Sequence, residues 1–208
     1  VRDLDQLVTL HPSHVSVYGL TVEPRTPLAR WVSRGATVPS DDERYADEYL
    51  LAHERLGAAG YQFYEVSNAS LPGFESRHNS AYWTGAPYRG LGPAAHSFDG
   101  RTRRWNLSAW EAYRAALADG KSPVEAEETL SDEQRHIERL YLGLRTSRGI
   151  PISDLALHSP TARPPDRLTA WTSAGWAEAS GDRVRLRPEG WLLLDALVRD
   201  LTGSPSVT

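Results

Sequence analysis

The pattern of apolar and polar positions predicts a strand, a long helix and a second strand early in the chain. His14–Leu20 alternates apolar and polar residues and carries β-branched side chains, which is typical of a strand. Apolar residues then recur at helical spacing over Tyr45–Ala59, and Gly60 ends that helix. Tyr61–Val66 predicts the next strand. Together they form a βαβ unit, whose two strands are expected to lie parallel and to leave an unpaired sheet edge.

Capping and turn residues predict further elements in the first 130 positions. Ser40 with Glu43, and Ser108 with Glu111, have the spacing of a capping box, so each pair predicts the start of a helix. The proline-containing segment Thr21–Pro39 is expected to be a loop.

A hairpin and a linker are expected next along the chain. Asp99 and Gly100 separate Ala95–Phe98 from Arg103–Trp105, which is a good hairpin signal. Lys121–Thr129 is acidic and contains proline, so it is expected to be a solvated linker between two domains, residues 1–121 and 122–208.

The second domain is predicted to be a small α+β module with a winged-helix-like layout. A helix is expected over Ser131–Arg145, followed by two shorter helices. Trp176–Leu186 predicts a hairpin that turns at Gly181-Asp182, and Glu189–Leu201 predicts a last helix. A winged-helix-like layout raises the question of DNA binding. The segment that would contact DNA mixes arginines with acids and prolines and lacks the basic stripe that phosphate binding needs, so DNA binding is not expected.

Composition narrows the class of protein. The chain has 208 residues, 40% of them hydrophobic and seven of them Trp, which is enough for a core. A net charge of -4 argues against general nucleic-acid binding. No apolar run has the length of a membrane span and no signal-peptide pattern opens the chain, so a cytoplasmic location is expected.

Two residue types are absent from the sequence. Without cysteine the chain has no disulfide, no thiolate ligand and no cysteine nucleophile. Without methionine it has no ordinary initiator. Together with the unpaired βαβ unit, this absence leads us to expect a part of a longer protein.

The segment Ser76–Ser97 carries the candidate chemistry. It reads SRHNSAYWTGAPYRGLGPAAHS and follows no strand or helix period, so a long functional loop is expected. Its aromatic rings and its two imidazoles, His78 and His96, suit a flat conjugated ligand, because rings stack and imidazole coordinates metal.

Several segments, in order, resemble the HemW family. These proteins are heme-chaperone relatives of the oxygen-independent coproporphyrinogen III dehydrogenases, in the radical S-adenosylmethionine superfamily. The resemblance rests on HVSVYGLTVEPRTPLAR, YEVSNAS, SRHNSAYW, YRGLGPAAHS and ERLYLGLRTSRGI. It covers nearly the whole chain and matches only the C-terminal half of the family's usual length.

The resemblance implies an α/β fold: the C-terminal portion of a partial (β/α) barrel, followed by the winged-helix-like domain. The parent protein would bind heme and pass it to an acceptor protein, with transient contact to a membrane protein. It would also use a [4Fe-4S] cluster and S-adenosylmethionine, but the cluster cysteines lie in the half that is missing here. This chain is therefore not expected to be catalytic alone, and whether the parent is an enzyme stays open.

The resemblance also implies site residues. Heme binding falls on the H-N-x-x-Y-W motif and on the end of the following glycine-rich segment: His78, Asn79, Tyr82, Trp83 and His96. His78 is the first choice for an axial iron ligand. A weaker correspondence assigns the adenosine side of the S-adenosylmethionine pocket to Gly19, Leu20 and Thr21. No catalytic residue and no cluster ligand is assigned.

Plainer alternatives remain at each level. His78 and Asn79 are also the kind of residues that satisfy loop backbone groups, and Tyr82 and Trp83 are the kind that plug a barrel end. Glu65 suits either a catalytic carboxylate at a strand end or an ion pair with an arginine. For the whole protein, the alternatives are a coproporphyrinogen III oxidase or dehydrogenase of porphyrin biosynthesis and an inactive truncated fragment.

Overall fold

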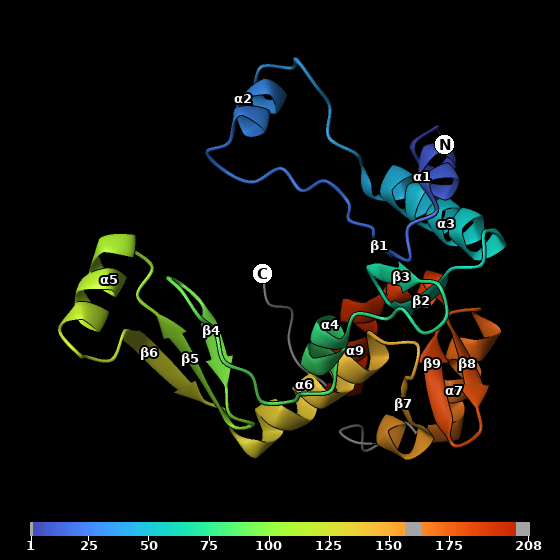
Figure 1. Cartoon of the computed structure of the whole chain (residues 1–208). Coiled ribbons are helices and arrows are strands. Elements are labelled where there is room, and N and C mark those ends of the chain that lie inside the picture. The colour runs from blue at the N-terminus through green and yellow to red at the C-terminus, as the bar shows by residue number, and fades with distance from the viewer. Residues whose placement is uncertain (1, 157–163, 203–208) are drawn as a thin grey trace.

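The computed structural model describes residues 2–156 and 164–202, so Val1, residues 157–163 and residues 203–208, which include the end of the predicted second domain, lie outside it. Figure 1 shows helices packed on a small sheet at the start of the chain. The first elements along the chain are α1 (Arg2–Leu10), β1 (His14–Ser16), α2 (Pro27–Ser33), α3 (Asp42–Ala58), β2 (Gln62–Glu65) and β3 (Asn68–Ser70). Helix α2 projects away from this sheet (Figure 1).

The two strands of the predicted βαβ unit run parallel, as expected, and an additional strand lies between them. Strands β1 and β2 both pair antiparallel with β3, in the order β1-β3-β2, so they run the same way without touching each other. The strand between them, β3, has the sequence Asn-Ala-Ser. Because Asn is depleted in strands, the sequence pattern did not predict this strand. All three of its residues are buried between the two neighbours.

Two predictions about the segment before α3 are wrong. The helix begins one residue later than Ser40 would require, and the carboxylate of Asp41 accepts from the backbone N–H of Arg44 at 2.9 Å. The expected loop contains the seven-residue helix α2, because Thr26 caps it and Pro27 suits its first position.

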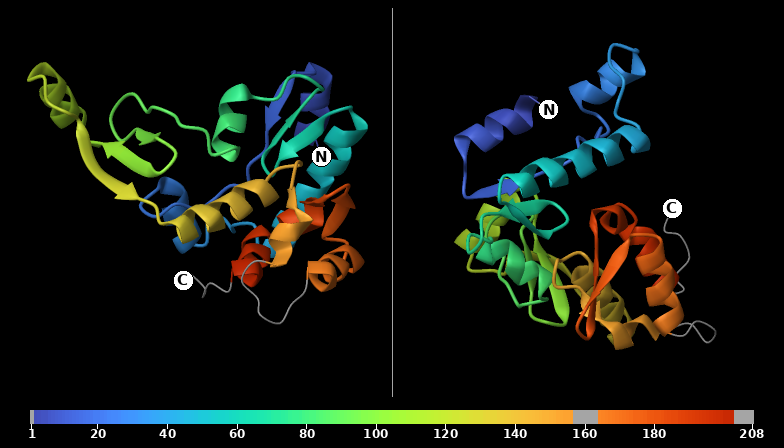
Figure 2. Two further views of the ribbon diagram at one scale, coloured as in Figure 1. Left: turned by 90° about the horizontal axis from the view of Figure 1, so that it is seen from below. Right: turned by 90° about the vertical axis from the view of Figure 1, so that its right-hand side faces the viewer.

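The middle of the chain forms an arm that projects from the rest of the molecule (Figures 1 and 2). Its elements are β4 (His96–Phe98), β5 (Thr102–Asn106), α5 (Trp110–Ala118) and β6 (Val124–Thr129). Helix α4 (Arg77–Trp83) precedes the arm along the chain and lies beside the rest of the molecule (Figure 1). The hairpin predicted around Asp99-Gly100 is confirmed as β4 and β5. The capping box predicted at Ser108 is wrong, because α5 begins at Trp110 without a side-chain cap.

The acidic linker is in fact the third strand of that sheet. β6 pairs antiparallel with β5, and this register puts Glu127 opposite Arg104 and Glu128 opposite Arg103. The acidic run is therefore matched by arginines across the ladder, which favours strand pairing over a solvated linker. The division into domains at residue 121 stays a prediction, although β6 beyond it joins the sheet before it.

The remaining elements form a compact unit around one core. They are α6 (Asp132–Leu144), β7 (Ile150–Pro151), the 3-10 helix η1 (Ile152–Ala156), α7 (Pro164–Ser173), β8 (Ala177–Ser180), β9 (Arg183–Leu186), α8 (Pro188–Trp191) and α9 (Leu194–Thr202). The hairpin predicted at Gly181-Asp182 is confirmed, and β7 adds a third strand in the order β7-β9-β8. The last predicted helix is divided into α8 and α9.

This core also holds the start of the chain in place. Leu140 and Leu144 of α6 are fully buried, and Tyr49 of α3 belongs to the same cluster. The indole N–H of Trp191 donates to the backbone oxygen of Leu144 at 3.0 Å. The contacts fix α3 and α6 relative to each other, and the candidate site lies beside α6. Among the described helices, none is long and apolar enough to cross a bilayer.

Candidate functional site

The H-N-x-x-Y-W motif lies on helix α4 and not on a structureless loop. Ser76 caps this helix, since its hydroxyl accepts from the backbone N–H of Asn79 at 3.2 Å. Helix α4 ends at Trp83, and Gly85 follows with a φ of 67°. A helix of two turns is too short to show a clear period in the sequence, which explains the wrong prediction.

The helix brings part of the motif together through its geometry. Residues four apart share a helix face, so the ring of His78 meets the ring of Tyr82 edge-on, with centroids 4.9 Å apart. Tyr82 in turn meets Tyr88 edge-on at 4.7 Å. Tyr88 exchanges two backbone hydrogen bonds with Phe98 of β4, at 2.8 and 2.9 Å. The imidazole therefore stands at one end of an aromatic row.

Asn79 contacts a different neighbour. Its side chain hydrogen-bonds with the hydroxyl of Tyr64, which also contacts the Nε2 of His14 at 2.8 Å. Burial raises the pKa of Tyr64, while hydrogen bonds from the Ser76 backbone and Asn79 act in the opposite direction. Asn79 thus contacts a tyrosine of the first sheet, and its orienting role stays a prediction.

Trp83 is held by a buried ion pair. The guanidinium of Arg145 lies 4.4 Å from the centroid of the Trp83 ring, within cation–π range. The same guanidinium lies 2.8 Å from the carboxylate of Glu65, whose side chain is 0% exposed. The other carboxylate oxygen of Glu65 accepts from the backbone N–H of Ser67 at 3.0 Å and from the side-chain amide of Asn68. Of the two alternatives for Glu65, the ion pair is the one observed.

A cleft of about 1240 Å³ opens beside α4. Tyr82 and Trp83 line one wall together with Tyr88, and residues of α6 and of the loop after it line the opposite wall. Ligand pockets usually have volumes of roughly 300–1,000 Å³, so the cleft is large enough for a sizeable ligand. His78, Asn79 and His96 do not line it. His78 is exposed on the helix that forms its wall.

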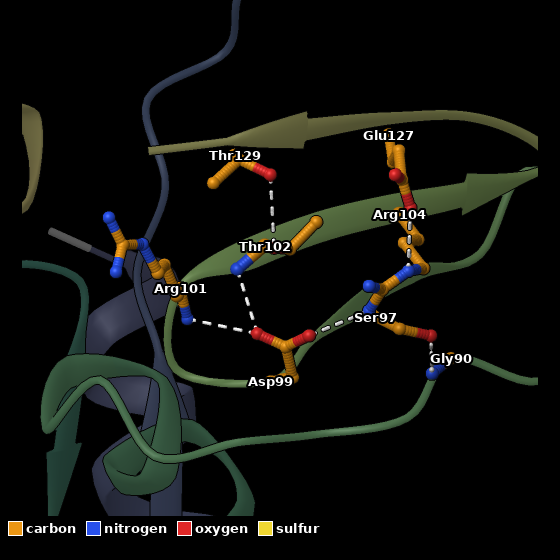
Figure 3. A network of polar contacts seen from close by, with 8 residues as sticks. All are labelled: Gly90, Ser97, Asp99, Arg101, Thr102, Arg104, Glu127 and Thr129. Carbon is orange, nitrogen blue, oxygen red and sulfur yellow. Dashed lines mark hydrogen bonds and ion pairs between the residues drawn. The ribbon is translucent and has the colours of Figure 1, made fainter. Parts of the chain in front are cut away.

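The hairpin that carries His96 is fixed by a polar network (Figure 3). Asp99 accepts from the backbone N–H groups of Thr102 at 2.8 Å and Arg101 at 3.0 Å, and from the guanidinium of Arg104 at 2.7 Å. The bond from Thr102, then those from Arg104 and Arg101, lower the pKa of Asp99 to about 2. Arg104 also pairs with Glu127 of β6 at 2.9 Å, which ties the hairpin to the third strand.

The segment before the hairpin is packed closely against it. The backbone N–H of Gly90 donates to the hydroxyl of Ser97 at 3.0 Å, as Figure 3 shows. A Cβ at Gly90 would lie 2.2 Å from the backbone oxygen of His96, so only glycine fits there. The ring of His96 itself is exposed and stacks on Trp105, with centroids 5.9 Å apart. Among the described contacts none joins His96 to His78.

The segment Gly19–Thr21 lies apart from the cleft. All three residues are exposed, beyond the end of β1, and none of them lines the cleft. The position of Gly19 is constrained by packing, because a Cβ there would lie 2.1 Å from the ring of Tyr45. The three residues that the resemblance assigned to S-adenosylmethionine therefore lie outside the lining of this cleft.

The donor set does not fit a [4Fe-4S] cluster. Such clusters are held by thiolates, and the sequence contains no cysteine. Within residues 2–156 and 164–202 there is also no group of three or more His, Asp or Glu side chains arranged to hold a metal ion. No step of the chemistry that follows is assigned to a cluster in this chain.

The cap of α4 provides a first test of how the motif is positioned. Replacing Ser76 with alanine is expected to cost about 1 kcal/mol of helix stability, because the N–H of Asn79 loses its acceptor. Hydrogen exchange of the α4 amides should then accelerate about fivefold. Ser76→Asp retains a capping acceptor and is the matched control. Equal exchange in the two variants would show that the cap does not order α4.

Comparisons with known proteins agree with the resemblance in the sequence. Residues 130–193 match the HemN C-terminal domain family. The heme chaperone HemW of Mycobacterium tuberculosis is 41% identical over 203 residues, which are 98% of this chain and 51% of that protein. The heme chaperone HemW of Bacillus subtilis is 31% identical over 149 residues, covering 72% and 39% of the two chains.

This chain is HemW-like. It spans about half the length of the curated relatives it matches, at 51% of the Mycobacterium tuberculosis protein. A solved structure gives the fold: the Escherichia coli coproporphyrinogen III oxidase HemN, described as a radical SAM enzyme, has a TM-score of 0.67 and 14% identity. That match covers 96% of the HemW-like chain and 50% of HemN. The predicted α/β class and the resemblance to the C-terminal part of such proteins are thereby confirmed.

Sequence reasoning missed the wall of the cleft that faces α4. Arg148 and Arg183 line that wall, and Arg145 stacks on Trp83 beside it. All three lie more than 60 residues after the motif, in a sequence with many arginines. The one available signal was the segment ERLYLGLRTSRGI, which contains two of them and which the resemblance already included. The HemW-like chain folds this segment against the motif helix, a long-range contact that no local pattern encodes.

Proposed function

We propose that this chain is part of a heme chaperone and binds heme at the cleft beside α4. The observation that carries the proposal is the pair Tyr82 and Trp83, which line the cleft, with the exposed imidazole of His78 one turn before Tyr82 on the same helix. Aromatic walls suit the flat face of a porphyrin, and a neutral imidazole is a common axial ligand of heme iron.

Within this proposal His78 is the axial ligand. It stands one helical turn before Tyr82 and is exposed, so its imidazole is accessible to heme bound at the edge of the cleft. Asn79 acts indirectly, through its hydrogen bond with Tyr64, which also lines the cleft. His96 on the hairpin is the second candidate, with Trp105 stacked on its ring.

The activity of the whole protein follows from the names of the relatives and is part of the proposal. The parent would pass heme to an acceptor protein in the cytoplasm, with transient contact to a membrane protein. It would use S-adenosylmethionine and a [4Fe-4S] cluster supplied by residues outside this chain. The alternative of a coproporphyrinogen oxidase is supported by the HemN C-terminal domain match over residues 130–193 and by the fold of the solved HemN structure, which is 14% identical.

A heme titration of the purified chain tests the proposal. We expect saturable binding, followed at the Soret band, and a weakened and shifted band in His78→Ala. A matched control is His11→Asn, which removes an exposed imidazole from a position with a φ of 49° that asparagine tolerates. His11→Asn should bind as the wild type does.

Two outcomes would contradict the proposal at different levels. If the folded wild-type chain binds no heme, heme binding by this chain is wrong. If heme binds equally well to His78→Ala and the wild type with the same spectrum, the ligand assignment is wrong. His96→Ala then tests the second candidate in the same titration.

A further inference from the structure

A smaller hollow adjoins the cleft at the wing formed by β8 and β9. It has a volume of about 260 Å³ and is lined by Ser147, Arg148, Ser180, Arg183 and Arg185. Three of these residues, Ser147, Arg148 and Arg183, also line the main cleft, so the two hollows share a wall. No acidic residue lines the smaller hollow within the described part of the chain.

Within the described part of the chain, two of its arginines have no carboxylate partner, unlike the other arginines of the two hollows. The paired ones are Arg103 with Glu138 at 2.7 Å, Arg135 with Asp132 at 3.7 Å, Arg139 with Asp154 at 3.7 Å, and Arg185 with Glu178 at 2.6 Å. Among residues 2–156 and 164–202, no Asp or Glu forms a salt bridge with Arg148 or Arg183. The hollow therefore concentrates two uncompensated positive charges.

The backbone holds these two side chains near each other. Arg183 donates from Nε to the backbone oxygen of Arg148 at 2.9 Å and from Nη2 to that of Gly149 at 2.6 Å. Gly149 has a φ of 64°, and a Cβ there would lie 1.9 Å from the backbone oxygen of Val184. The loop that carries Arg148 is thus packed directly on β9, and the guanidinium of Arg183 is fixed with donors to spare.

Fixed guanidinium donors without an acid partner suit a carboxylate ligand. Arginine presents parallel N–H donors that match the two oxygens of a carboxylate, and such charge-assisted bonds are stronger than neutral ones. The hydroxyls of Ser147 and Ser180 add further polar groups to the same walls. Because Arg148 and Arg183 line the main cleft as well as the smaller hollow, a ligand whose flat body lies beside Tyr82 and Trp83 has both arginines in the lining of the same cleft.

We propose that Arg148 and Arg183 bind the propionate carboxylates of the tetrapyrrole whose ring lies in the main cleft. The assignment rests on the proposed heme binding and adds the orientation: the propionate edge faces the wing, and the opposite edge faces the arm. It also gives the second half of this chain a role in recognising the ligand. The H-N-x-x-Y-W motif, which lies in the first half, assigns no role to the second half.

A comparison of heme with heme dimethyl ester, which has no free carboxylate, tests this assignment. Both ligands are titrated from the same detergent-containing buffer into the full chain and followed at the Soret band. Arg148→Gln is expected to weaken heme binding about tenfold and to leave binding of the ester unchanged. Arg183→Lys keeps the positive charge but loses the parallel N–H donors of the guanidinium. It should weaken heme binding by less than about tenfold and leave binding of the ester unchanged.

The matched control is Arg114→Gln on α5, which removes an exposed arginine paired with Glu111 at 2.8 Å in the arm. It should leave the affinity for both ligands unchanged. Circular dichroism of each variant verifies that its fold is retained.

The outcomes separate this assignment from the proposed function. If the wild type binds neither ligand, heme binding fails and the assignment fails with it. If it binds both equally, or if Arg148→Gln weakens both equally, heme binding stands and the propionate assignment is wrong. If inorganic phosphate binds the wild type and not Arg148→Gln, and neither phosphate nor the variant alters heme affinity, the hollow is a site for free anions and the assignment is again wrong.

Discussion

Replacing Arg145 with methionine is expected to destabilise the fold by about 3 kcal/mol or more, because it leaves a charge buried without its partner. The carboxylate of Glu65 is 0% exposed and Arg145 is its ion-pair partner at 2.8 Å. The hydrogen bonds from Ser67 and Asn68 remain in the variant and compensate only part of the loss. Urea unfolding of the variant and the wild type at neutral pH measures the difference.

A double-mutant cycle separates the ion pair from the packing of the two side chains. Glu65→Gln keeps an acceptor for Ser67 and removes the charge, so Glu65→Gln combined with Arg145→Met should be less destabilised than the sum of the single variants. Additive effects, or a loss below about 1 kcal/mol in Arg145→Met, would contradict a stabilising buried pair.

The same pair links the folded core to the candidate site. Arg145 stands directly after α6 and stacks on Trp83 of α4, while Glu65 ends β2. The backbone N–H of Val66 also donates to the oxygen of Arg145 at 3.1 Å. Loss of the guanidinium therefore releases the wall of the cleft that carries Trp83, and the indole fluorescence of the variant should report it together with the loss of stability.

The elements that could be predicted are those with strong local signals. The β4–β5 hairpin turns at Asp-Gly, the wing turns at Gly-Asp, and α6 has both a cap and an apolar face. The elements that were missed are short, or they are stabilised from a distance. Helix α4 has two turns, β3 is buried because it lies between two strands, and β6 depends on arginines of β5.

The candidate site divides in the same way. The sequence indicates the motif helix, because His78, Tyr82 and Trp83 stand within six residues of one another. It does not indicate that Arg145 lies on Trp83 or that Arg148 faces the cleft, since these contacts depend on how α6 packs against the first sheet. Nor did it indicate that His78 and His96 would stand apart, one on a helix and one on a hairpin.

The free energy of unfolding is expected to fall by about 1.5 kcal/mol between about pH 7.5 and about pH 5, because His53 is buried in its neutral form. This magnitude allows for solvent screening, since the side chain is partly exposed. Its ring stacks on Phe63 with centroids 3.5 Å apart, and the rings of Tyr49 and Trp191 lie at 4.6 and 5.5 Å. Burial lowers the pKa of His53 to about 4 from 6.5, and its Nε2 has no hydrogen-bond partner among the described residues.

The sign of this effect follows from which state takes up the proton. The imidazole of the unfolded chain is protonated as the pH falls through about 6.5, while the folded one stays neutral down to about 4. The contribution of His53 to stability is therefore complete above about pH 7.5 and is lost progressively as the pH falls through 6.5 toward about 4. His53→Phe should flatten the dependence of urea stability on pH, and His11→Asn should retain it. If His53→Phe keeps the full slope, other groups cause the loss and His53 is not buried in its neutral form.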